Sequence, residues 1–178
     1  FYNIEIEASN QRWLYLLPIA EVTRSFDGEI FPTIMDDDFS LFMTNPIDKP
    51  RRFQAKSHLS YTIEPAMTLD RQALETQLPN DFNPKAKAFA RQLYQQSGSA
   101  EVFVDQLFSY FQREAFFYSF EPPKLGANSV DEFLFETREG FCEHYASAFV
   151  FLTRSVGIPS RIVIGYQGGE ITDGSRVV

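Results

Sequence analysis

The sequence predicts an α+β protein in which an all-β part over residues 1–75 precedes a mixed helical part over residues 76–178. Three observations lead to this prediction. Short apolar runs with alternation fill residues 1–64, turn-forming glycine and proline pairs separate these runs, and helical spacing takes over from Leu78. With 44% hydrophobic and 16% aromatic residues, the 178-residue chain has enough apolar side chains for a folded core.

The alternating runs at the start of the chain predict five or six strands. They read "FYNIEIEA", "RWLYLLPI", "FSLFMTN" and "RFQAKSHLSYTIEP". Alternation is typical of strands with one buried face, so a β-sandwich is expected here, with the single tryptophan, Trp13, in its core. The acidic "MDDDF" at residues 35–39 indicates a solvated turn, because a site for a hard cation spreads its oxygen ligands over about a dozen residues.

Helical signals start at Asn83, which is expected to be an N-cap followed by Pro84 at the first helical position. The apolar stripe of this helix is Ala86, Phe89, Ala90 and Leu93. Ser99 is expected to cap a second helix. The apolar face of that helix is Val102, Leu107, Phe108 and Phe111. A strand at "FFYSFE" and a capping box from Ser129 to Glu132 are expected to follow.

The only cysteine, Cys142, lies in "GFCEHYASAFVFLTRSVGIPSRIVIGY". Gly140 permits a tight turn, and the apolar spacing after it predicts a helix that begins at Cys142 and ends near Gly157. A strand over Arg161 to Tyr166 is expected to pack against this helix. The unpaired N–H groups at a helix start favour a thiolate and can stabilise an oxyanion, so Cys142 is a candidate nucleophile. The alternative is a buried cysteine that serves only packing.

A thiolate that transfers acyl groups needs an imidazole to carry protons, and the chain has two histidines. His144 follows Cys142 by two residues and lies roughly on the opposite side of the helix, so it is not expected to act as the base. His58 is expected to be a structural or surface residue of the β-rich part. Residue spacing alone therefore identifies no partner for the thiol.

Charge narrows the classes of function. The formal net charge of −8 argues against binding nucleic acid or anionic lipid, because both require clustered lysine and arginine. No cofactor or metal site is expected. The chain begins with Phe1 and contains no run of about 18 apolar residues, so we expect it to be part of a longer protein.

Residues 116–170 closely resemble the transglutaminase-like core of the bacterial membrane-anchored transglutaminase family. The shared motifs are "GFCEH", the "R-x-x-G-I-P-x-R" pattern from Arg154 to Arg161, and "GYQGGE" from Gly165 to Glu170. The lead-in "LPNDFNPKAKAFARQL" at residues 78–93 is also similar to the family, and the β-rich start resembles the family's N-terminal periplasmic domain more weakly.

This resemblance implies that residues 76–178 form a truncated papain-like core that uses a cysteine, histidine and aspartate triad. Cys142 matches the nucleophile, and its backbone N–H matches an oxyanion donor. The histidine and aspartate of the family follow the "GGE" loop and match no residue of this chain. The chain alone is therefore expected to be inactive, whereas its parent is expected to be an enzyme.

For the parent, the resemblance implies a protein-glutamine γ-glutamyltransferase that joins a glutamine donor in a protein or peptide to an amine acceptor. It also implies a periplasmic location and inner-membrane anchors outside this chain. A cysteine protease or amidase acting on peptidoglycan or periplasmic proteins is the alternative enzyme, since only the acceptor differs. A non-catalytic binding domain is the third possibility. Cleft shape and water exclusion, which decide the acceptor, are not readable from sequence.

Other residues near the thiol have simpler expected roles. Glu143 is expected to stabilise the helix start, with contact to a substrate amine as the alternative. Arg154 and Arg161 are expected to fix the turn between them. Tyr166 and the Gly168-Gly169 pair either line the cleft as a mobile loop or form an ordinary turn.

Overall fold

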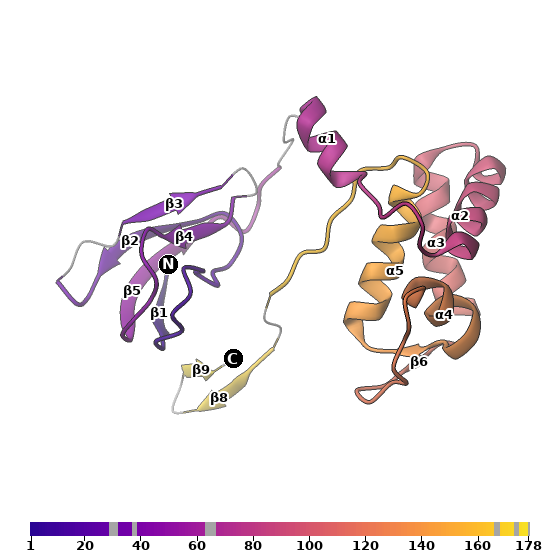
Figure 1. The fold of residues 1–178 in the computed structure, drawn as a ribbon. Coiled ribbons are helices and arrows are strands. Elements are labelled where there is room, and N and C mark those ends of the chain that lie inside the picture. The colour runs from indigo at the N-terminus through magenta and orange to yellow at the C-terminus, as the bar shows by residue number, and fades with distance from the viewer. Residues whose placement is uncertain (29–31, 37–38, 63–66, 166–167, 173–174, 178) are drawn as a thin grey trace. The chain divides into compact units, whose positions relative to one another are not determined.

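The computed structural model describes residues 1–28, 32–36, 39–62, 67–165, 168–172 and 175–177. In that part of the chain it is a mixed α/β structure with five α-helices and several antiparallel strand pairs (Figure 1). The chain separates into two compact units, one made of Phe1–Ala66 with Gly165–Val178 and the other of Met67–Ile164. The division at residue 75 expected from sequence stays a prediction.

The first unit is built from strands. They are β1 (Tyr2–Ile6), β2 (Ala20–Ser25), β3 (Thr33–Met35), β4 (Leu41–Met43), β5 (Arg51–Ser57), β8 (Glu170–Thr172) and β9 (Ser175–Val177). β5 pairs antiparallel with β1 on one side and β2 on the other, while β3 pairs with β4 and β8 with β9. Because side chains alternate along β5, its inward residues Phe53 and Ala55 are fully buried. The expected number of five or six strands is confirmed by β1 to β5, but the run "RWLYLLPI" at residues 12–19 forms only an isolated bridge from Trp13 to Phe42, and β2 begins after it at Ala20. The sandwich stays a prediction.

Two details of this unit bear on the sequence predictions. The expectation that Trp13 lies in the core is wrong, because the indole is 50% exposed and touches Phe42 edge-on at 6.4 Å between ring centroids. Tryptophan is large enough that a half-exposed position against one neighbour is common. The expected acidic turn joins β3 to β4, where the Asp36 carboxylate accepts the backbone N–H of Ser40 at 2.8 Å. Asp37 and Asp38 lie outside the described residues.

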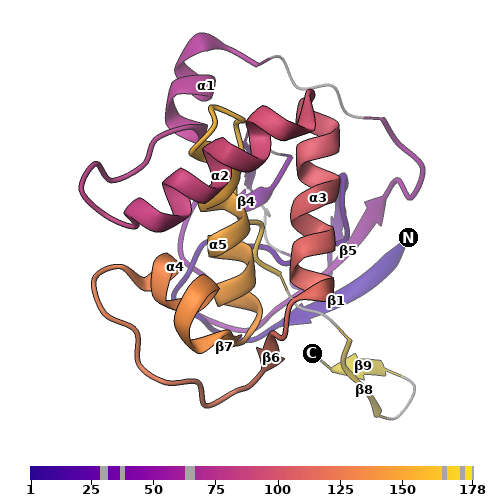
Figure 2. The ribbon, with the colours of Figure 1, turned by 90° about the vertical axis from the view of Figure 1, so that its right-hand side faces the viewer.

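The second unit is mainly helical. Its elements are α1 (Leu69–Glu75), α2 (Pro84–Ser97), α3 (Ala100–Arg113), β6 (Phe117–Tyr118), α4 (Ser129–Glu132), the π-helical segment η1 (Phe133–Thr137), β7 (Glu139–Gly140) and α5 (Cys142–Arg154). Helices α2, α3 and α5 lie side by side, with α4 and the parallel pair β6 and β7 near the start of α5 (Figure 2). The predicted helix that begins at the thiol is confirmed.

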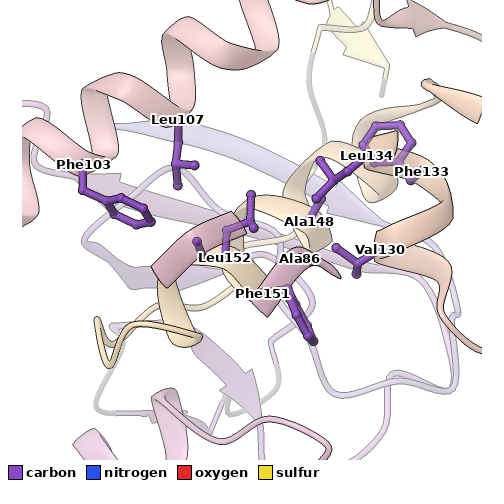
Figure 3. Close-up of a cluster of buried hydrophobic side chains, with 10 residues drawn as sticks. Ala86, Phe103, Leu107, Val130, Phe133, Leu134, Ala148, Phe151 and Leu152 are labelled. Atoms are coloured by element: carbon purple, nitrogen blue, oxygen red, sulfur yellow. The ribbon is translucent and has the colours of Figure 1, made fainter. Parts of the chain in front are cut away.

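The core of this unit surrounds α5. Its fully or nearly buried members are Ala86, Ala90, Phe103, Leu107, Val130, Phe133, Leu134, Ala148, Phe151 and Leu152 (Figure 3). The expected stripe of α2 is confirmed, since Ala86 and Ala90 are fully buried and Phe89 and Leu93 pack against them. Alanine lets α2 approach α5 closely, and each large side chain contributes about 1.5–3 kcal/mol through burial. The position of α5, and with it Cys142, is thus set by the core.

The start of α2 is capped from a distant part of the sequence. Asn83 precedes the helix, as predicted, but its side chain makes no capping bond to α2. The carboxylate of Asp131 instead accepts the backbone N–H groups of Lys85 at 2.9 Å and Ala86 at 2.7 Å. The Asn83 side-chain oxygen accepts the N–H groups of Val130 and Asp131 in α4. The predicted role of the Asn83 side chain was therefore wrong.

The other two expected caps have different outcomes. Ser99 caps α3, because its hydroxyl accepts the N–H of Val102 at 3.3 Å, as predicted. The capping box from Ser129 to Glu132 is not formed. Glu132 instead accepts the N–H of Gly126 at 2.7 Å, so its carboxylate holds the loop before α4 rather than the start of that helix.

Candidate active site

Helix α5 presents the thiol at its first residue. Phe141 is the N-cap, with φ −111° and ψ −174°, and Cys142 follows as the first helical residue with an exposed side chain. The N–H groups of the first helical turn have no acceptor within the helix, and they stabilise negative charge nearby. A buried packing role for Cys142, which was the alternative at the sequence level, is excluded by this exposure.

Glycine is required at position 140 because a side chain would not fit there, and not because of the backbone conformation. It is buried, and its φ is not among the positive values of the chain. A Cβ atom at this position would lie 2.7 Å from Cβ of His144 and 3.0 Å from the ring of Phe133. The glycine before Cys142 therefore allows β7 to pass directly against α5.

His144 closes the start of the helix. The Nδ1 atom of its side chain accepts the backbone N–H of Phe141 at 3.3 Å, and the backbone N–H of His144 donates to the Phe141 carbonyl at 2.9 Å. The imidazole lies edge-on to the Phe141 ring at 4.6 Å and contacts the Phe133 ring at 5.7 Å between centroids. The structure thus gives His144 a capping role. His58 is exposed just after β5, as expected for a surface histidine.

Aromatic rings pack around Tyr145, one turn into α5. Its ring contacts Phe133 at 5.1 Å and Phe111 at 5.8 Å between centroids, and it stacks on Tyr118 of β6 at 6.3 Å. Burial raises the pKa of the Tyr145 phenol above its usual value, and the neighbouring Tyr118 adds to the effect. The phenol is therefore neutral at physiological pH and serves packing at the start of α5.

A groove of about 530 Å³ opens beside the start of α5. It is lined by Phe120, Glu121, Pro122, Pro123, Lys124, Leu125, Ser129, Val130, Phe133, Phe141, Glu143, His144 and Ser147. Cys142 does not line it, but the residues on both sides of Cys142 do. Phe120 is 83% exposed at the rim, so the groove offers an apolar surface with a few charges next to the thiol. This volume is in the range of ligand-binding clefts.

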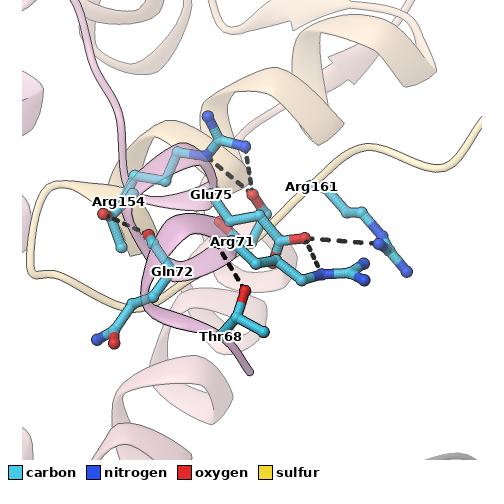
Figure 4. Close-up of polar contacts among 8 residues, drawn as sticks. Thr68, Arg71, Gln72, Glu75, Arg154 and Arg161 are labelled. Atoms are coloured by element: carbon cyan, nitrogen blue, oxygen red, sulfur yellow. Dashed lines mark hydrogen bonds and ion pairs between the residues drawn. The ribbon is translucent and has the colours of Figure 1, made fainter. Parts of the chain in front are cut away.

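The turn after α5 is held by arginine, as predicted. Arg154 donates through Nε to the Ser160 carbonyl at 2.8 Å and through Nη1 to the Gln77 carbonyl at 3.1 Å. Glu75 accepts Nε of Arg71 at 3.0 Å and lies 3.5 Å from Nη1 of Arg161 (Figure 4). These contacts join the end of α5 to α1 and to the lead-in before α2.

The segment after this turn differs from expectation. Residues 161–165 form no strand, which corrects the predicted strand from Arg161 to Tyr166, and Tyr166 itself lies outside the described residues. Ile162, Val163 and Ile164 are exposed, and a strand requires a neighbouring strand to accept its backbone hydrogen bonds. Gly168 and Gly169 have positive φ values of 84° and 115°, as in turns.

The described residues lack both a metal-binding cluster and a membrane-spanning helix. No group of three or more histidine, cysteine, aspartate or glutamate side chains is arranged to hold a metal ion there. Within the same ranges, no helix combines the length and the hydropathy needed to cross a membrane.

Sequence reasoning missed two features of this site. The first is the His144 cap, although a residue with a side-chain acceptor three positions after an N-cap is the spacing of a capping box and could have identified it. The second is the groove, which depends on how the loop over residues 119–128 folds back toward α5. No local pattern in the sequence indicates that arrangement.

Residues 87–177 match the Transglutaminase-like superfamily, and the chain belongs to this superfamily. It is 36% identical, over 96% of its length, to the protein-glutamine gamma-glutamyltransferase of Pseudomonas aeruginosa, and spans 25% of that protein. It is also 39% identical over 53% of its length to the uncharacterized protein YebA of Bacillus subtilis, of which it spans 13%.

The fold has a close counterpart among solved structures. The crystal structure of the periplasmic domain of TgpA from P. aeruginosa bound to ethylmercury matches 96% of this chain with a TM-score of 0.86 and 35% identity. The present chain covers 59% of that domain. The match extends over both compact units, so the β-rich unit as well as the helical unit belongs to this architecture.

Proposed function

We propose that this chain carries the nucleophile of a transglutaminase-type cysteine acyltransferase and that Cys142 is this nucleophile. The observation that carries the proposal is the exposed thiol at the first residue of α5, a helix held by a buried core. Membership of the superfamily and similarity to a protein-glutamine gamma-glutamyltransferase support the reaction class.

In the proposed reaction, the Cys142 thiolate attacks the carboxamide carbon of a glutamine side chain. The backbone N–H of Cys142 donates to the oxyanion that forms. The amide nitrogen then takes up a proton, the C–N bond breaks, ammonia leaves, and a thioester remains on the sulfur. A primary amine attacks the thioester, the C–S bond breaks, and the product is a substituted amide with a free thiol restored.

The proton transfers require an imidazole, which in this proposal comes from the parent protein outside residues 1–178, together with an aspartate that orients it. Neither His58 nor His144 matches the family pattern for this role. We place the protein in the periplasm, with its parent anchored in the inner membrane. The similarity to the periplasmic domain of TgpA supports this location.

The groove beside the thiol is the proposed binding surface for the protein or peptide substrate. Its apolar wall at Phe120 and Phe141 suits the side chains that flank a reactive glutamine, and its position next to Glu143 places a bound peptide near Cys142. The groove is formed by the loop over residues 120–125 together with α4, η1 and the start of α5, and an extended segment can enter it from solvent.

Amine incorporation tests the proposal. The full-length parent, with Cys142 intact or changed to alanine or serine, is incubated with a glutamine-rich protein and a fluorescent primary amine, and covalent label is measured. Incorporation that is lost in both variants is expected. Incorporation that persists in Cys142→Ala would remove Cys142 from the mechanism, and release of peptides without label would indicate the protease or amidase instead.

A further inference from the structure

Both backbone groups of Phe141 are bonded to a single residue. Its N–H donates to the side-chain Nδ1 of His144 at 3.3 Å, and its carbonyl accepts the backbone N–H of His144 at 2.9 Å. The same carbonyl also accepts the N–H of Tyr145 at 3.4 Å. The backbone on either side of the Phe141 Cα atom is therefore fixed against the first turn of α5.

These hydrogen bonds determine where the N–H of Cys142 points. The carbonyl of Phe141 and the N–H of Cys142 belong to one planar peptide group, so holding the carbonyl also holds the N–H. Fixing the Phe141 N–H as well sets the two backbone angles of Phe141, at −111° and −174°. A donor aimed in advance at a developing charge needs no reorganisation during reaction.

The imidazole itself has little freedom to move. It lies against the rings of Phe141 and Phe133, and the backbone of Gly140 leaves no room for a Cβ atom beside it. These contacts come from three separate segments, namely β7, the N-cap and η1. The surroundings of His144 thus hold the ring in the orientation that its hydrogen bond requires.

The hydrogen bond also assigns the tautomer of His144. Because Nδ1 accepts the Phe141 N–H, the neutral ring carries its proton on Nε2. Neither nitrogen of this tautomer can then take the proton of the Cys142 thiol. The role that remains for His144 acts through the backbone.

We propose that His144 is a positioning residue that aims the Cys142 N–H at the oxyanion of the acyl-transfer reaction. The inference rests on the proposed function of Cys142. It assigns to the histidine of the "GFCEH" motif a task separate from proton transfer. It also explains why glycine precedes the N-cap residue of α5, since any side chain there would displace His144.

Two reagents separate this role from a general structural one. p-Nitrophenyl acetate acylates a thiol through an oxyanion and releases a leaving group that needs no acid, whereas iodoacetamide alkylates a thiol without forming an oxyanion. The ratio of the two rate constants, measured on chain 1–178, therefore reports the oxyanion donor. Both rates share the exposure and ionisation of the same thiol, so those factors cancel in the ratio.

A matched pair of variants isolates the acceptor. His144→Gln keeps an acceptor at the third helical position, where glutamine bonds the N-cap N–H in capping boxes, and His144→Met has similar size but no such acceptor. Relative to the wild type, we expect the ratio to fall roughly three- to tenfold in His144→Met, the effect of about one hydrogen bond, and to be largely kept in His144→Gln. His58→Met makes the same change at the other histidine and is expected to leave the ratio unaltered.

The outcomes distinguish this inference from the function on which it rests. Two results together would overturn the role of His144 and leave Cys142 as the nucleophile. These are a wild-type ratio above that of N-acetylcysteine and equal ratios in the glutamine and methionine variants. A wild-type ratio no higher than that of N-acetylcysteine would contradict an oxyanion donor at Cys142 and so count against both. If His144→Met does not fold, His144→Gln is measured alone. A fall of roughly three- to tenfold in the ratio of His144→Gln relative to the wild type would then also refute the inference.

Discussion

Asp131 caps the helix that follows Asn83, and Asn83 in turn caps the helix that contains Asp131. The Asp131 carboxylate accepts two N–H groups at the start of α2, and the Asn83 oxygen accepts two at the start of α4, at distances between 2.7 and 3.2 Å. Asn83 and Asp131 are 5% and 3% exposed. Because water does not reach these groups freely, each side chain is the main partner available to the other helix.

Replacing Asp131 with alanine is expected to lower the free energy of unfolding by about 2 kcal/mol. The change leaves the N–H groups of Lys85 and Ala86 without their acceptor at a buried helix start. Urea unfolding followed by circular dichroism measures the loss. Asp105→Ala removes a carboxylate from an exposed position on α3 and should change the free energy by less than about 0.5 kcal/mol. Equal effects in the two variants would contradict the capping role.

Glu101 makes the start of α3 sensitive to acid. A hydrogen bond from its own backbone N–H and a second from Ser99 lower the pKa of the Glu101 carboxyl below the usual 4.5. A lowered pKa in the folded state means that ionised Glu101 stabilises the protein above pH 4.5 and that this stabilisation is lost as the pH falls through the folded value. Glu101→Gln is therefore expected to be less stable than wild type at pH 7, with a smaller difference at a pH well below 4.5. Urea unfolding at the two pH values tests this, and a difference independent of pH would refute it.

The sequence predicted the helical unit well where neighbouring residues decide the structure. Pro84 at the start of α2, Ser99 at the start of α3 and Cys142 at the start of α5 all follow from local capping and spacing. The Asn83 cap was mistaken because its true partner is Asp131, 48 residues away. A side chain such as Asn83 can bond either the adjacent helix or a distant one, and the local sequence does not indicate which.

Long-range contacts also explain why the predictions outside the helices were wrong or incomplete. The alternating apolar residues Ile162 and Ile164 indicate a strand, but a strand forms only where another supplies hydrogen bonds. For the candidate site, the sole cysteine at a helix start was identifiable from its position. The groove was not, because it depends on the loop containing Phe120 lying against Phe141 and Glu143. Long-range packing of this kind leaves no periodic pattern.

Phe120 tests the groove as a substrate surface. Because this side chain is 83% exposed at the groove, we expect Phe120→Ala to leave the fold intact and to raise KM for a glutamine peptide several-fold, with little change in kcat. Steady-state amine incorporation by the full-length parent measures both constants. Phe117→Ala removes an aromatic ring that is 64% exposed but does not line the groove, so it is the matched control. A similar rise in KM in both variants would argue against the groove.

The final prediction separates the reactivity of Cys142 from catalysis. In chain 1–178 the thiol at the start of α5 is expected to be alkylated by iodoacetamide at pH 7, because its side chain is exposed. Mass spectrometry of the protein over time measures this alkylation.

The same chain is nevertheless expected to incorporate no amine beyond the level of its Cys142→Ala variant. Positioned proton transfer contributes roughly 10²- to 10⁴-fold to rate, and Nδ1 of His144 is engaged by the Phe141 N–H rather than available to a leaving group. The parent, assayed in parallel at equal concentration, is expected to be active. Incorporation by chain 1–178 equal to that of the parent would show that a base within these residues serves Cys142. A folded chain that iodoacetamide does not label would instead show that the thiol is not accessible at the start of α5.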